Sequence, residues 1–233
     1  MATRLVVIER IEQHTPTTKI FRLVGRAGAP FRFVTGQYCL LSFDGKAENE
    51  RPFTYTNCSL QNDYVELAIK QTGEVTDALH RCSVGQRLFL TEAQPSDLEF
   101  DPNRGQRVAL VAGGSGITPC ISILRHIGIQ RLPHEAALFY SNASAADIIY
   151  RQQLDELAAR HPTIRVVYTL TRPAPADWPY ERGRINPQMI QQRLAHPTDW
   201  HWYVCGPQAF NSAMTEALIT LHVPMAQVHL GEG

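Results

Sequence analysis

The sequence feature that most constrains the fold is a glycine-rich turn that follows an apolar run. Residues 108–111 are apolar, and the turn reads Gly113-Gly114-Ser115-Gly116-Ile117-Thr118-Pro119. A strand, a glycine turn and a helix with proline in its first turn form the phosphate-binding edge of a parallel sheet. The turn therefore predicts a nucleotide site at Gly113, Gly114, Ser115, Gly116 and Thr118. The alternative is a turn that needs glycine only for its own geometry. Because the lysine of a P-loop is missing, kinase-type chemistry is disfavoured.

The second half of the chain alternates between strand and helix patterns. Apolar, β-branched runs predict strands at 107–112, 136–141, 164–170 and 202–205, with 227–230 closing the sheet. The stretches between them predict helices at 119–128, 145–161, 187–194 and 207–222. This alternation predicts an α/β domain with a doubly wound parallel sheet.

The first half of the chain has a different pattern. Short β-rich segments separated by turn residues predict strands at 4–11, 19–24, 38–43, 52–56, 64–70 and 87–92, with one brief helix at 75–81. Such a series predicts a small antiparallel β-barrel. The polar segment 94–106 carries proline and glycine and separates the two patterns, so we predict two domains, 1–98 and 99–233.

A second motif lies on one of the predicted barrel strands and reads Arg51-Pro52-Phe53-Thr54-Tyr55-Thr56-Asn57. Proline keeps the preceding residue extended, and period-two alternation predicts that Arg51, Phe53 and Tyr55 share one face of the strand. Thr54 and Thr56 are then expected on the other face. A guanidinium can clamp a phosphate, an aromatic ring can stack on a flavin, and a hydroxyl can bond its reactive nitrogen. The alternative is an ordinary barrel strand with a surface arginine.

Two weaker signals accompany these motifs. The stretch Gln71-Thr72-Gly73-Glu74-Val75-Thr76 turns from a strand into a short helix, where amides and the Thr76 hydroxyl can receive a second phosphate. The alternative is a plain capping turn with Thr76 as the N-cap. Cys205-Gly206-Pro207 ends a predicted strand, which places Cys205 at the carboxyl edge of the sheet, although a buried cysteine is usually inert. Two separate anion sites indicate two phosphorylated cofactors and a transfer between them.

Composition argues against several other functions. Lys plus Arg and Asp plus Glu number 22 each, so no net field favours nucleic acid or an acidic membrane. The cysteines at 39, 58, 82, 120 and 205 have neither C-x-x-C nor iron–sulfur spacing, and the histidines are dispersed, so no metal site is expected. The N-terminus becomes charged at Glu9-Arg10, too early for a signal peptide. No stretch approaches the ~18 apolar residues of a membrane span, so we expect a cytoplasmic protein.

With these residues in place, the chain resembles the ferredoxin–NADP reductase superfamily, in particular its stand-alone flavodoxin/ferredoxin reductase and flavin reductase branches. Arg51-Pro52-Phe53-Thr54 resembles the flavin motif R-x-Y-[ST], and Gly73-Glu74-Val75-Thr76 matches the phosphate turn G-x-x-[ST]. Residues 113–119 match the nucleotide motif G-G-[ST]-G-I-[TA]-P at every position, and 205–207 match C-G-P. The four motifs follow the family's order and cover nearly the whole chain.

The resemblance implies a role for each motif. Domain 1–98 would bind FAD: Arg51 would pair with the flavin phosphate, Phe53 would stack on the isoalloxazine, and Thr54 would lie near flavin N5. Residues 73–76 would hold the pyrophosphate, and 113–118 in domain 99–233 would bind NADH or NADPH. Cys205 would lie beside the nicotinamide during hydride transfer, and Glu232 would stand for an acidic residue that some members carry near the flavin.

Three departures from the family pattern affect these expectations. Phe53 replaces the common tyrosine, which keeps the ring and loses a hydroxyl. Asn57 replaces Ser or Thr, as in FMN-using reductases, so FAD is favoured and FMN is the alternative. The chain ends His229-Leu230-Gly231-Glu232-Gly233 and not in an aromatic that covers the flavin. A flat substrate would then approach more freely, unless residues have been lost from this end.

The function implied by the resemblance is a flavin-dependent reductase. It would pass electrons from NAD(P)H through FAD to a ferredoxin, a flavodoxin or another soluble acceptor. The alternatives are an NAD(P)H:flavin reductase that releases reduced flavin and a non-catalytic electron-transfer subunit of a larger complex. A 2′-phosphate needs a cation just after the second parallel strand. Residues 140–144 carry none, which favours NADH, although Arg151 or Arg172 can reach back.

Overall fold

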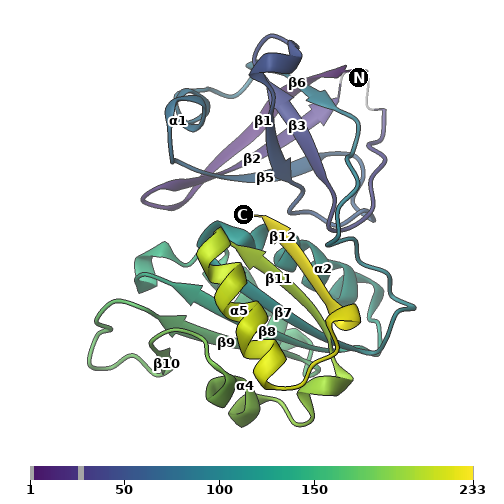
Figure 1. Cartoon of the computed structure of the whole chain (residues 1–233). Coiled ribbons are helices and arrows are strands. Elements are labelled where there is room, and N and C mark those ends of the chain that lie inside the picture. The colour runs from purple at the N-terminus through teal and green to yellow at the C-terminus, as the bar shows by residue number, and fades with distance from the viewer. Residues whose placement is uncertain (1–2, 26–28, 233) are drawn as a thin grey trace.

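Two six-stranded sheets, one from each half of the chain, form the framework of the protein (Figure 1). The structure, a computed structural model, describes residues 3–25 and 29–232. The first sheet is antiparallel and the second is parallel, which confirms the predicted N-terminal β-barrel and doubly wound α/β domain. Residues 92–106 join the two sheets, and the boundary between 98 and 99 stays a prediction.

The barrel follows the turn-punctuated pattern of the first half. Its elements are β1 (Thr3–Thr15), β2 (Thr18–Gly25), β3 (Tyr38–Ser42), β4 (Arg51–Thr54), β5 (Val65–Lys70), α1 (Glu74–His80) and β6 (Arg87–Thr91). The strand order is β4-β3-β6-β1-β2-β5, and a bridge between Tyr55 and Leu67 brings the chain after β4 back to β5, which closes the sheet. Val65, Leu67 and Ile69 of β5 belong to the barrel core, whereas Ala68 belongs to the core of the second domain. Alternate residues of one strand therefore serve the two domains.

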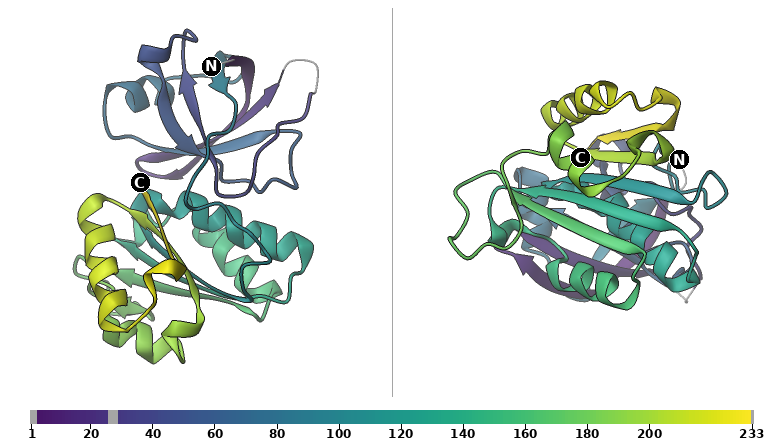
Figure 2. Two further views of the ribbon diagram at one scale, coloured as in Figure 1. Left: turned by 45° about the vertical axis from the view of Figure 1, so that its right-hand side comes forward. Right: turned by 90° about the horizontal axis from the view of Figure 1, so that it is seen from below.

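The α/β domain is wound on both sides of its sheet. Its elements are β7 (Arg107–Gly113), α2 (Ile117–Gln130), β8 (Glu135–Asn142), α3 (Arg151–Arg160), β9 (Ile164–Leu170), β10 (Glu181–Arg182), α4 (Pro187–Arg193), β11 (His201–Gly206), α5 (Gln208–Thr220) and β12 (Val228–Glu232). The strand order is β10-β9-β8-β7-β11-β12, with α2 and α3 on one face and α4 and α5 on the other (Figure 2). The order reverses between β7 and β11, and ligands of open α/β sheets bind at such a switch point.

The helix predicted over 145–161 is wrong at its N-terminal end. A short 3-10 turn occupies Ala145–Asp147, and α3 begins only at Arg151. The Asp147 carboxylate accepts hydrogen bonds from the Ser144 amide (3.0 Å) and hydroxyl (2.7 Å), which closes the turn as a separate unit. Tyr150 is left-handed, with φ of 60°, so the helix cannot continue back through it. The short strand β10 is also absent from the sequence-based expectation.

The carboxyl end of β12 reaches the junction of the two domains (Figure 1). Gly231 in this strand lies so close to Leu98 that an added Cβ would be 2.1 Å from the leucine side chain. The carboxyl edge of the parallel sheet, the segment that joins the two sheets, and the barrel therefore meet at this junction. Within residues 3–25 and 29–232, every helix is too short or too polar to cross a bilayer.

Candidate functional site

One cavity at the junction of the two domains contains three of the four predicted motifs. Its volume is ≈ 550 Å³, and small-molecule sites commonly occupy about 300–1,000 Å³. The residues that line it are Arg51, Pro52, Phe53, Thr54, Ala68, Lys70, Thr72, Gly73, Glu74, Val75, Thr76, Ser115 and Thr118. Strand β4, the start of α1 and the start of α2 therefore meet at one site.

Strand β4 supplies the barrel side of this cavity. It pairs with β3, and its exposed Arg51 donates from Nη1 to Glu50 O at 2.7 Å. Thr54 lines the same cavity as Arg51 and Phe53, whereas alternation had predicted it on the other face. Tyr55, predicted beside Arg51 and Phe53, is instead buried in the barrel core. The reason is that β4 ends at Thr54, and the chain then turns across the barrel to pair Tyr55 with Leu67.

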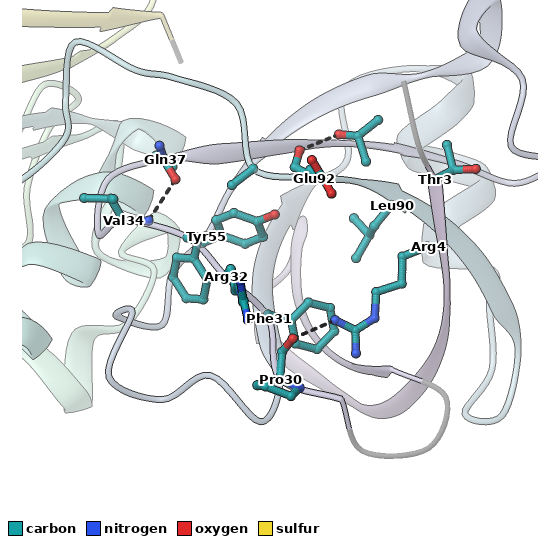
Figure 3. A pocket seen from close by; sticks show the side chains of 13 residues that line it. Thr3, Arg4, Pro30, Phe31, Arg32, Val34, Gln37, Tyr55, Leu90 and Glu92 are labelled. Carbon is teal, nitrogen blue, oxygen red and sulfur yellow. Dashed lines mark hydrogen bonds between the residues drawn. The ribbon is translucent and has the colours of Figure 1, made fainter.

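Tyr55 lines a second cavity, of ≈ 750 Å³, in the barrel (Figure 3). The Arg4 guanidinium carbon lies 4.0 Å from the centre of the Phe31 ring, and Arg4 Nη1 donates to Pro30 O at 3.0 Å. None of the predicted cofactor-binding residues, all of which lie in the described ranges, lines this cavity. The candidate site is therefore the cavity between the domains.

The turn before α1 is closed by Thr76. This hydroxyl accepts hydrogen bonds from the Thr72 amide (2.9 Å) and the Gly73 amide (3.0 Å) and donates to Gly73 O (2.9 Å). Gly73 is the N-cap and Thr76 the third helical residue, so the alternative with Thr76 as the N-cap is wrong. The amides of Glu74 and Val75 lie in the first turn and have no intrahelical acceptor, which is the feature that favours an anion at a helix start.

The glycine turn after β7 is fixed by close backbone packing. Residues Gly114–Gly116 form a 3-10 turn that leads directly into α2, and Gly114 has a left-handed φ of 56°. A Cβ added to Gly116 would lie 2.0 Å from Cys205 O, so only glycine fits at this point. The Tyr140 hydroxyl donates to Gly114 O at 3.0 Å. The turn is thereby held against β11 while Ser115 and Thr118 line the cavity.

The C-G-P motif lies behind the glycine turn and not on the cavity wall. Cys205 and Gly206 end β11, Pro207 precedes α5, and Cys205 is 2% exposed. Burial raises the pKa of the Cys205 thiol to about 12, so the thiol is neutral at physiological pH. The backbone of Glu232, in β12, pairs with that of Gly206, in β11. The Glu232 side chain lies outside the described part of the chain. No group of three His, Cys, Asp or Glu side chains is placed to hold a metal ion within the described residues.

Comparison with known proteins adds sequence relatives to this geometry. Residues 110–216 match the family of oxidoreductase NAD-binding domains. NADH-cytochrome b5 reductase 1 of Dictyostelium discoideum is 30% identical over 183 residues, which cover 76% of this chain and 63% of that protein. NADH-cytochrome b5 reductase 2 of Aspergillus oryzae is 30% identical over 173 residues, which cover 71% of this chain and 52% of that protein. The chain thus matches 52% to 63% of the length of these relatives.

Solved structures share the whole two-domain fold. The flavohaem-like FAD/NAD-binding domain of nitric oxide dioxygenase from Vibrio cholerae has a TM-score of 0.87 at 20% identity, covering 99% of this chain and 98% of that chain. A ferredoxin NADP⁺ reductase from Neisseria gonorrhoeae has a TM-score of 0.82 at 20% identity, covering 100% of this chain and 99% of that chain. At these identities the solved structures show a shared fold, and it is the two-domain fold expected for the superfamily that the four motifs resemble.

Sequence reasoning misses two of the residues that line the cavity. Ala68 and Lys70 reach the cavity from β5, on the face opposite to the core residues Leu67 and Ile69. Period-two alternation along β5 predicts that Ala68 and Lys70 share one face of the strand. It does not predict that the second domain covers this face. Lys70 adds a second cation to the cavity that Arg51 also lines.

Proposed function

We propose that this protein is an NAD(P)H-dependent flavoprotein reductase that binds FAD on the barrel and the nicotinamide nucleotide on the glycine turn. The observation that carries the proposal is a cavity that holds predicted motif residues of both domains, Phe53 and Thr54 on one side and Ser115 and Thr118 on the other. Reacting atoms must approach to about 3–3.5 Å for transfer. A site between the domains allows each domain to hold one of the two reacting rings.

The barrel side of the cavity fits a flavin that carries phosphate. Arg51 and Lys70 supply two cations, and α1 adds the amides of a helix start. A Cβ added to Gly73 would meet nothing within 4 Å, so the space beside this turn is open. We assign Phe53 to stacking on the flavin ring, Thr54 to its reactive edge and residues 73–76 to the pyrophosphate. A bound flavin supplies hydride acceptance and release of electrons one at a time.

The α/β side of the cavity suits the nicotinamide nucleotide. We assign the turn from Gly113 to Thr118 to this nucleotide, with the turn 205–207 packed behind it. Because the Cys205 thiol is neutral and buried, we propose that Cys205 acts beside the nicotinamide by packing against the glycine turn and not by charge. Glu232 keeps its proposed place near the flavin, since its backbone pairs with Gly206 at the carboxyl edge.

We propose NADH as the electron donor. Arg151 Nε donates to Asp155 Oδ2 at 2.8 Å, and the Arg151 guanidinium carbon lies 4.2 Å from the Tyr168 ring centre, so this cation is already held. Arg172 is exposed, and its amide donates to Ala143 O at 3.1 Å, directly after β8. Arg172 is thus the cation that would contact the 2′-phosphate of NADPH if this nucleotide were the donor. A preference for NADPH that survives the Arg172→Ala substitution would contradict this assignment.

We propose a small one-electron carrier as the acceptor. The curated relatives are named NADH-cytochrome b5 reductases, so a haem protein of the cytochrome b5 kind is the first acceptor to test. A ferredoxin or a flavodoxin, expected from the resemblance of the motifs, is the alternative. Reduction of each carrier under the same conditions ranks them directly.

The decisive experiment is an anaerobic absorbance spectrum of the purified protein before and after stoichiometric NADH and then NADPH. We expect flavin bands that bleach with NADH, and extraction of the flavin then distinguishes FAD from FMN. A bound flavin that neither nucleotide reduces would point to an electron-transfer subunit. A colourless protein that oxidises NADH only with added flavin would point to a flavin reductase that releases its product.

A further inference from the structure

Two elements that line the cavity, β5 and α2, continue in phase to a second group of polar residues, and the chain that follows β4 reaches the same group. Thr54 of β4 lines the cavity, and Thr56 lies two residues further along the chain. Ala68 of β5 lines it, and Glu66 lies two residues back on the same face. Thr118 of α2 lines it, and residue 125 lies two helical turns further on. The second group is therefore a direct continuation of the site along the domain junction.

These residues form a cluster across the two domains, which we call the junction cluster: Thr56, Glu66, Arg125 and Tyr150. Arg125 Nη1 donates to Glu66 Oε1 at 2.6 Å and to Thr56 O at 2.7 Å. The Thr56 hydroxyl donates to Glu66 Oε1 at 2.8 Å. The Tyr150 hydroxyl lies 3.0 Å from the same carboxylate oxygen and 2.9 Å from Thr56 Oγ1. Glu66 Oε1 of the barrel thus accepts hydrogen bonds from residues of α2 and of the start of α3.

Three members of the junction cluster, Thr56, Glu66 and Tyr150, are buried, and the Arg125 side chain is 15% exposed. Glu66 is 6% and Tyr150 1% exposed. Burial alone would raise the pKa of Glu66, but the Arg125 charge and the hydrogen bonds from Arg125, Thr56 and Tyr150 outweigh it, and the pKa is lowered. A buried ion pair keeps its charges only while its partners stay in place. A change in the angle between the domains would separate Glu66 from Arg125.

Helix α2 carries this constraint to the site. Ser122 Oγ donates to Asn57 O at 2.9 Å, and His126 Nδ1 lies 2.8 Å from Thr35 Oγ1, so α2 contacts the barrel along one face. The same helix begins at Ile117, directly after the glycine turn. The position of α2 on the barrel therefore sets where Ser115 and Thr118 stand relative to Phe53 and Thr54.

We propose that Arg125, Glu66 and Tyr150 are positioning residues that set the distance between the nicotinamide held by the glycine turn and the flavin held by β4. The inference rests on the proposed function. Hydride transfer is sensitive to the approach of the reacting atoms, and an error of about 1 Å costs about 10²-fold in rate. Loosening the junction cluster slows transfer between two ligands that are both still bound.

The test uses two mild substitutions in the full-length protein loaded with flavin. Tyr150→Phe removes one hydroxyl from the junction cluster and keeps the ion pair, and Glu66→Gln keeps the shape of the side chain and removes its charge. For each variant, rapid mixing with NADH measures the limiting rate of flavin reduction, the apparent dissociation constant of NADH, and the long-wavelength charge-transfer absorbance of stacked nicotinamide and flavin. We expect the limiting rate to fall by about 10-fold for Tyr150→Phe and more for Glu66→Gln, with a weaker charge-transfer band. The dissociation constant should change by less than about threefold.

The control is Arg160→Gln, which removes the exposed pair of Arg160 Nη2 with Glu156 Oε2 at 3.2 Å on the same domain. This variant should match the wild type in all three quantities. Variants of the junction cluster that melt earlier but keep the wild-type rate and charge-transfer band have only a structural role, and this result overturns the inference alone. A wild-type protein whose flavin neither nucleotide reduces overturns the proposed function, and the inference falls with it. Arg125→Lys, which keeps the charge with fewer donors, should recover part of the rate that Arg125→Met loses.

Discussion

The two turns proposed to hold phosphate groups, at Gly73 and at Gly116, are built in different ways. A Cβ added to Gly73 would meet nothing within 4 Å, whereas one added to Gly116 would lie 2.0 Å from Cys205 O. The Gly73 turn is closed by the hydroxyl of Thr76, three residues along the chain. The Gly116 turn is closed by β11, which lies far away in the sequence. The first turn is thus a product of local sequence and the second a product of strand order.

The helices that follow the turns differ in the same way. α1 has 7 residues, and α2 has 14. Short helices are marginal by themselves and depend on packing and capping. α2 is in addition fastened to the barrel through Ser122 and Arg125. We therefore expect changes at the Gly116 turn to affect the whole molecule and changes at the Gly73 turn to affect mainly the ligand.

The largest effect should follow Gly116→Ala. The added methyl group would overlap a backbone carbonyl, which cannot rotate away as a side chain can. We expect a loss of about 3 kcal/mol in the free energy of unfolding, which corresponds to a fall of about 6–12 °C in Tm for a chain of this size. Thermal unfolding and the dissociation constant of NADH, which should rise more than about tenfold, measure the effect. Wild-type values for both would show that the turn is not wedged against β11.

A smaller effect should follow Thr76→Val, which keeps the shape of the side chain and removes three hydrogen bonds. We expect the free energy of flavin binding to become less favourable by about 1 kcal/mol, because the turn shapes the proposed pyrophosphate site. This change corresponds to an approximately fivefold weaker binding of flavin. Binding of NADH to flavin-loaded protein should stay unchanged. Weaker NADH binding with normal flavin binding would reverse the assignment of the two turns.

The sequence predicts the turn at Gly73, which depends on nearby residues, better than the packing of the turn at Gly116, which depends on β11. Hydrophobic periodicity and turn residues locate both sheets, and three of the four motifs supply residues that line the cavity, whereas Ala68 and Lys70 are missed. Tyr55 is misplaced because barrel closure onto Leu67 interrupts the alternation of β4. The helix at 145 begins late because Tyr150 is left-handed and turns its hydroxyl to the barrel. Arg125 and Glu66 lie 59 residues apart, so no local pattern joins them.

Lowering the pH to about 6 should have a smaller effect, to which His126 in α2 contributes. Burial lowers the pKa of His126, and the nearby His134 adds to the shift against a hydrogen bond with Gln130. Because the pKa of His126 is lower in the folded than in the unfolded chain, its contribution to stability is complete above the unfolded pKa of about 6.5 and declines as the pH falls below it. Urea unfolding at pH 8, 7 and 6 should show stability constant between the first two values and lower at the third. His126→Gln should reduce this loss, and an equal loss in the variant would assign the effect to other groups.

The smallest effect on stability should follow Gly73→Ala, the same chemical change as Gly116→Ala at the other turn. The φ of Gly73 is 169°, an extended conformation that alanine adopts freely, and the space beside it is open. We expect a change within about 0.5 kcal/mol. If flavin binding weakens while stability stays the same, the new methyl group can only be meeting the ligand, and the open space is the pyrophosphate site. If stability falls as far as in Gly116→Ala, the Gly73 turn is not a local structure, and the contrast between the two turns is wrong.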